Sequence, residues 1–193
     1  MRYPKDHKEK ARRRLVEHGG GHAKKHGFSG SGMDALAAAA GVTAGSLYKH
    51  FDGKSDLFAA VVHAELQRTA EMYRAIAADD PEAAKKSLAA YLSLHHVRHP
   101  EQGCLLPSLT PEVARADESV RAAFQAGLLE IHAAVERLTG ASDEAWALVA
   151  QNVGTIMIAR AMLDEKVQRE LLAAARREGQ ALFHKSTGSA REG

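Results

Sequence analysis

Seven residues between positions 43 and 54 have side chains of the kinds that contact duplex DNA. Ser46 can exchange a hydrogen bond with a base edge, Ala44 can pack against a thymine methyl group, and Lys49 can reach a guanine or a phosphate. The other four are donors that commonly meet phosphate oxygens: Thr43, Tyr48, His50 and Lys54. An ordinary helical hairpin with a polar face carries similar residues, so their types alone leave both interpretations open.

The segments that would position these residues have the pattern of a helix-turn-helix. Residues 33–40 (MDALAAAA) predict a short helix, and Gly41 can adopt the left-handed conformation that ends such a helix. Thr43 is a favourable N-cap for a second helix over residues 44–50. The apolar residues that would form a shared core are Leu36, Ala39, Ala40, Val42, Leu47 and Phe51. In this arrangement the second helix enters the major groove of DNA.

Lys54 and the distribution of charge favour the same interpretation. Lys54 opens the next predicted helix, where free backbone N–H groups point outward, so it is predicted to clamp a phosphate. Residues 1–54 contain 11 Lys and Arg against 5 Asp and Glu, a net charge of +6, whereas the remaining residues contain 15 against 19. A basic N-terminal part on a mildly acidic body is typical of a nucleic-acid-binding protein.

The run from Phe28 to Val62 resembles the DNA-binding domain of the TetR (tetracycline-repressor) family of transcription regulators. The matching positions are Gly41-Val42-Thr43, Gly45, Leu47-Tyr48, His50-Phe51, Lys54 and Leu57-Phe58. Many matches at fixed spacing are far more specific than one short motif. The resemblance implies a homodimer on a palindromic operator, a helical C-terminal ligand-sensing domain, and repression that a small molecule relieves.

The whole chain has the pattern of an all-α protein. We expect about nine helices: 6–26, 33–40, 44–50, 54–78, 81–98, 112–115, 117–139, 142–163 and 164 to about 185. Pro81 follows a cap at Asp80, and Ser142 is expected to cap the eighth helix. Residues 1–54 are predicted to form the helix-turn-helix domain and 55–185 a helical ligand-sensing and dimerisation domain. Residues 186–193 are predicted to be a disordered tail.

Two features of the first predicted helix have more than one explanation. Gly19, Gly20 and Gly21 lie in its middle, where each glycine costs roughly 1 kcal/mol relative to alanine. They indicate either close packing against the fourth helix or a locally soft helix. His18, His22 and His26 form one stripe, which we interpret as a solvated surface rather than a metal site, because no carboxylate or thiolate shares that face.

The last two predicted helices are apolar on more than one face. A helix that is hydrophobic nearly all round must be buried on all sides, so these helices predict a homodimer interface. Gly154 and Ala150 would allow a second backbone to approach closely. Paired DNA-binding domains also fit the twofold symmetry of a palindromic operator.

Residues 103–115 (GCLLPSLTPEVAR) resemble a segment of one TetR branch in which a Gly-Cys pair precedes a short helix. In some family members a cysteine there responds to electrophiles or oxidants. Cys104 has His95, His99 and Arg98 nearby in sequence, which favours its thiolate, although a small buried hydrophobe is the alternative. An effector cavity is expected among residues such as Tyr73, Tyr91, His95, Cys104, Phe124 and Trp146.

Several classes of protein are not favoured by the sequence. It contains no glycine-rich phosphate loop, nucleophile elbow or metalloprotease helix, so no enzymatic activity, cofactor or metal is predicted. No apolar run is long enough to span a membrane, and the single cysteine suits a cytoplasmic protein. The sequence therefore predicts a repressor released by a small-molecule effector. The alternatives are a redox or electrophile sensor acting through Cys104 and a constitutive DNA-binding dimer without ligand.

Overall fold

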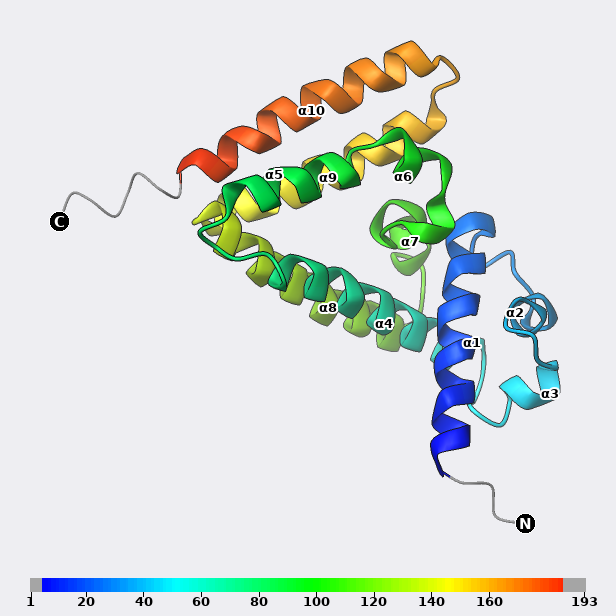
Figure 1. Ribbon diagram of the computed structural model, residues 1–193. Coiled ribbons are helices and arrows are strands. Elements are labelled where there is room, and N and C mark those ends of the chain that lie inside the picture. Colours follow the sequence, from blue (N-terminus) through cyan, green and yellow to red (C-terminus); the bar gives the residue numbers. More distant parts are fainter. Residues whose placement is uncertain (1–4, 186–193) are drawn as a thin grey trace. The chain divides into compact units, whose positions relative to one another are not determined.

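The computed structural model describes the backbone of residues 5–185 and the side chains of residues 9–183. Every regular element in this range is a helix (Figure 1), which confirms the predicted all-α fold. The helices are α1 (Lys5–His26), α2 (Met33–Ala39), α3 (Ala44–Leu47), α4 (Lys54–Arg74), α5 (Pro81–Tyr91), α6 (Leu94–Arg98), α7 (Leu106–Val113), α8 (Glu118–Thr139), α9 (Ser142–Ala161) and α10 (Glu165–Lys185), with a short 3-10 helix η1 (Pro100–Gln102). The predicted disordered tail, 186–193, lies outside the described residues.

The helices pack into two compact units. Among the described residues, the first contains those up to Leu66 together with Pro100–Gly127, and the second contains Gln67–His99 together with those from Leu128 on. Helices α4 and α8 contribute to both units. The predicted domain boundary after residue 54 falls inside the first unit. That residues 1–54 form the DNA-binding part stays a prediction.

The first unit is built around α1, which packs against α2, η1 and α7. A Cβ atom on Gly20 would lie 3.3 Å from Val61 Cγ1 and 3.4 Å from Glu65 Oε1, so α1 and α4 approach closely at this glycine. The sequence left two explanations open for the glycines, and close packing is the one that applies to Gly20. Beside it, the buried Lys24 ammonium donates to Glu65 Oε2 at 2.8 Å and to the carbonyl of Gly103 at 2.9 Å. The pair is almost fully buried, and a buried charge must be paired to be tolerated.

The second unit packs α10 against α9 and α5, and α6 against α9. The packing is close at Gly179, where a Cβ atom would lie 2.8 Å from Leu88 Cδ2 and 3.0 Å from Leu148 Cδ1. The Arg160 guanidinium donates to the backbone carbonyls of His96 and Val97, which fixes α6 on α9. No described helix is apolar enough over its length to cross a membrane.

Several predicted helix boundaries are wrong, and the fourth helix, for example, ends at Arg74 rather than at residue 78. The segment 81–98 is two helices, because the Ser93 hydroxyl accepts from His96 N–H at 3.2 Å and caps a new helix. The helix expected at 112–115 is α7, which begins at Leu106 and contains Pro111. Proline has no backbone N–H, so Pro111 cannot donate to the carbonyl of Pro107 four positions back. Ser142 is the first residue of α9 rather than its cap, which is Ala141.

Candidate nucleic-acid interface

The predicted recognition helix, α3, is held at its start by two local features that the sequence predicts. Gly41 has φ +68°, the left-handed conformation that ends α2. The Thr43 hydroxyl accepts a hydrogen bond from Ser46 N–H at 3.2 Å, so Thr43 is the N-cap of α3. Leu47 is fully buried and attaches the helix to the core, together with Phe51.

The recognition helix is shorter than predicted. It ends at Leu47, and the chain continues through residues 48–50 as tight turns. The N–H of Lys49 bonds to the carbonyl of Ser46 and the N–H of His50 to that of Leu47, which are bonds between residues three apart. Tightening of this kind is common where a helix ends, because it satisfies the last carbonyls. The predicted helix to residue 50 is therefore replaced by one α-helical turn and a tighter continuation.

Most of the predicted DNA contacts on this segment are accessible. Tyr48 is 57% exposed, and Thr43 and Lys49 are also exposed. Ala44, Ser46 and His50 are half-buried. Within residues 43–50 only Leu47 is buried, and the other residues are at least partly accessible.

Lys54 is the first residue of α4, as the sequence predicts. Its ammonium nitrogen donates to the carbonyl of Ser29 at 2.8 Å and lies 5.6 Å from the centre of the Phe28 ring. An ammonium has three N–H donors, so this bond orients Lys54 and leaves donors for a phosphate. The phosphate clamp itself stays a prediction.

Glu112 of α7 is a residue of this site that the sequence did not indicate. Its carboxylate accepts from the backbone N–H groups of Phe28, at 3.1 Å, and Ser29, at 2.5 Å. The two segments are more than 80 residues apart in sequence. No local pattern predicts such a contact, because capping and turn signals act only over a few residues.

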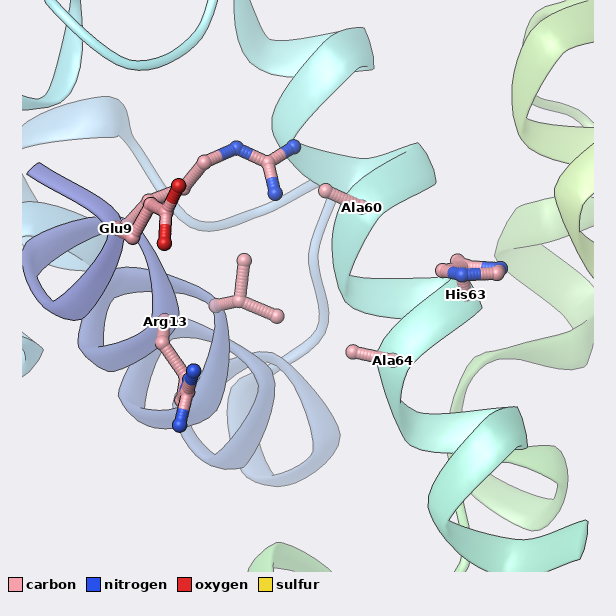
Figure 2. A pocket seen from close by; sticks show the side chains of 7 residues that line it. Glu9, Arg13, Ala60, His63 and Ala64 are labelled. Atoms are coloured by element: carbon pink, nitrogen blue, oxygen red, sulfur yellow. The ribbon is translucent and has the colours of Figure 1, made fainter. Parts of the chain in front are cut away.

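A groove of about 340 Å³ lies between α1 and α4. Figure 2 shows Glu9 and Arg13 of α1 on one side and Ala60 and Ala64 of α4 on the other. Its other lining residues are Arg12, Val16 and His63. The Arg12 guanidinium lies 4.9 Å from the centre of the Phe51 ring, which links α1 to the segment that follows α3.

The predicted effector-site residues occupy several different environments, and none of them lines this groove. In the second unit Tyr73 and Tyr91 are half-buried, and Tyr91 meets His96 edge to face at 4.6 Å. His95 is exposed and its ring lies 4.5 Å from that of His99. Trp146 is 39% exposed and stacks on His132. In the first unit Phe124 is half-buried and Cys104 is buried. Their role stays a prediction.

Two histidines of the α1 stripe lie close together. The rings of His22 and His26 are 4.6 Å apart. Partial burial, and then the charge of His26, lower the pKa of His22. Among the side chains that the structure describes, no group of three or more His, Cys, Asp or Glu residues is arranged to hold a metal ion.

Residues 23–61 match a known protein family, described as "Bacterial regulatory proteins, tetR family". Solved structures similar to the whole chain include the reduced form of NemR from E. coli, with 23% identity, a TM-score of 0.69 and coverage of 90% of this chain and 97% of that one. Regulatory protein TetR from Rhodobacter sphaeroides has 22% identity, a TM-score of 0.69 and coverage of 90% and 98%. A transcriptional regulator from Rhodococcus sp. Rha1 has 19% identity, a TM-score of 0.72 and coverage of 91% and 96%. No curated protein is similar enough to count as a relative.

Proposed function

We propose that this protein, whose residues 23–61 match the TetR family of bacterial regulatory proteins, is a sequence-specific transcriptional repressor that a small-molecule effector releases from its operator. The observation that carries the DNA-binding part is the capped helix α3, whose polar residues are presented at the positions that match the family. Release by an effector is supported by the family resemblance.

The residues of the interface fall into two roles. Ala44, Ser46 and Lys49 are proposed to read base edges in the major groove, because their side chains supply a methyl contact, a hydroxyl and a long cation. Thr43, Tyr48, His50 and Lys54 are proposed to contact phosphates, which set the orientation of the protein without selecting a sequence. The basic residues of α1 add sequence-independent attraction, which falls as the salt concentration rises.

The protein is further proposed to act as a homodimer through α9 and α10. Large apolar side chains are exposed along this part of the second unit: Trp146, Met157, Ile158, Leu163 and Val167. Exposed apolar residues gathered on two consecutive helices are typical of a protein interface. A Cβ atom on Gly154 would meet nothing within 4 Å, so space is available there for a second backbone. A twofold dimer would offer two recognition helices to a palindromic operator.

The proposal is tested by footprinting on the DNA upstream of the protein's own gene, followed by titration of the protected duplex. We expect one palindromic protected site, binding at a stoichiometry of at least one dimer per site, and an affinity that falls steeply with salt. Absence of binding to any duplex at low ionic strength would refute the proposal. Release is tested separately, by adding candidate small molecules to the formed complex.

A further inference from the structure

The loop between α1 and α2 is fixed by one side chain from a distant segment. The carboxylate of Glu112 accepts from two consecutive backbone N–H groups, one oxygen bonding to Phe28 and the other to Ser29. Hydrogen bonds to an ionised carboxylate are roughly twice as strong as those between neutral groups. Glu112 is half-buried, so water competes only in part for these donors.

The shape of the loop fits this carboxylate closely. Gly27 has φ +82°, a conformation that residues with a Cβ atom rarely adopt. A Cβ atom at this position would also lie only 2.9 Å from Glu112 Oε1. Gly27 is therefore needed both for the turn and for the space that the carboxylate occupies.

The same loop holds the proposed phosphate-binding lysine. The Ser29 residue donates its N–H to Glu112 and accepts the Lys54 ammonium on its carbonyl at 2.8 Å. The Phe28 ring lies beneath that ammonium and stacks on Phe58 of α4, with 4.0 Å between ring centres. The position of Lys54 therefore depends on a loop whose own position depends on Glu112.

A second contact from the same segment lies next to Lys54. The hydroxyl of Ser55 donates to the carboxylate of Asp117, which follows α7. Glu112 and Asp117 thus contact the structure on both sides of Lys54, one through the loop before α2 and the other directly on the first turn of α4.

We infer that Glu112 is a positioning residue for DNA binding, which places Lys54 by fixing the loop at Phe28 and Ser29. The inference rests on the proposed function. Without this carboxylate the two N–H groups lose their acceptor, and the Ser29 carbonyl that orients Lys54 is no longer held in place. Lys54 should then bind a phosphate less tightly.

The test is a double-mutant cycle on operator binding by the full-length protein, with Glu112→Gln, Lys54→Ala and the double variant. Glutamine keeps the size of the side chain but turns an NH₂ group toward one backbone N–H, so one acceptor is lost. We expect Glu112→Gln to weaken operator binding about tenfold, as for one charge-assisted hydrogen bond, and to have no further effect when Lys54 is already alanine. Glu118→Gln, which changes the charge equally at an exposed position on α8, is the control and should bind as the wild type does.

Amide hydrogen exchange on the DNA-free protein provides the second readout. In Glu112→Gln the amides of Phe28 and Ser29 should exchange at least several-fold faster, while those of the α1 core keep their protection. If glutamine prevents folding, Glu112→Asp keeps the charge but shortens the reach, and the same two measurements apply to it.

Two results would overturn the inference while the proposed function stands. One is an equal loss of affinity from Glu112→Gln with and without Lys54, and the other is unchanged exchange at Phe28 and Ser29. If instead the wild-type protein binds no duplex, the proposed function itself fails, and the positioning role fails with it.

Discussion

Lys54 and Lys49 are both cations near the recognition helix, but the structure places them in different settings. Lys54 is oriented by the carbonyl of Ser29, whereas Lys49 is exposed on the segment after α3. Lys54→Ala should weaken binding to all sequences alike and reduce the slope of log affinity against log salt by about 1. Lys49→Ala should change the preference among operator variants, by about 1–3 kcal/mol at the base it contacts. Titrations of both variants on matched and scrambled duplexes at two salt concentrations distinguish these roles; unchanged affinity of Lys54→Ala at low salt would rule out the clamp.

His22 should make the free energy of unfolding depend on pH. Its pKa in the folded protein is lowered by burial and by His26, so below about pH 6.5 the unfolded chain binds a proton more readily than the folded one. The free energy of unfolding should therefore rise with pH through this range and fall as the solution is acidified. Urea denaturation at pH 5.5 and 7.5 should show a smaller difference for His22→Gln than for the wild type. The exposed His63 provides the control substitution, and an equal flattening by His63→Gln would contradict this assignment.

The alternative role of Cys104, as a redox or electrophile sensor, can be tested at this single residue. Its side chain is 7% exposed, and a buried thiol reacts slowly with reagents in solution. We therefore expect Cys104→Ser to respond to an electrophile as the wild type does. Release measured with an electrophile, for the wild type and for Cys104→Ser, decides the alternative: loss of release in the serine variant alone would establish Cys104 as the sensor.

At the scale of the element, the contact between α1 and α4 explains why adjacent glycines are not equivalent. A Cβ atom on Gly19 meets nothing within 4 Å, whereas one on Gly20 presses on Val61 and on Glu65, the partner of Lys24. Gly19→Ala should raise the free energy of unfolding by about 0.5–1 kcal/mol, because alanine favours the helix. Gly20→Ala should give no such gain, since the new methyl group crowds the buried ion pair. Chemical denaturation of the two variants measures the difference, and an equal gain at both positions would show that α1 and α4 do not pack this closely.

The elements also show what the sequence can and cannot predict. The cap at Thr43 and the turn at Gly41 were correct, because both depend on neighbouring residues whose preferences are local. The break at Ser93 was missed, because serine is tolerated inside helices and its capping role depends on how the following turn packs. The contact of Glu112 with Phe28 and Ser29 was out of reach, since only the folded chain brings those segments together.

At the scale of the whole molecule, the proposed dimer makes DNA binding depend on apolar residues that do not touch DNA. Ile158 is 52% exposed on α9 and Val167 is 41% exposed on α10. Ile158→Glu should convert the dimer to a monomer in analytical ultracentrifugation and weaken binding to a two-half-site operator by at least 100-fold, because two linked half-sites bind far more tightly than one. Leu129→Glu alters a similarly exposed residue on α8 and should leave the protein dimeric. A dimer that persists in Ile158→Glu would place the interface elsewhere.

The brevity of α3 has a consequence for engineering. Of its four residues only Leu47 is buried, and the framework that seats it consists of the hydroxyl of Thr43 and the ring of Phe51. We expect that the outward side chains around them can be replaced by those of another regulator while Thr43, Leu47 and Phe51 are retained. A chimera made in this way should bind the donor's operator, which titration on the two operators would check.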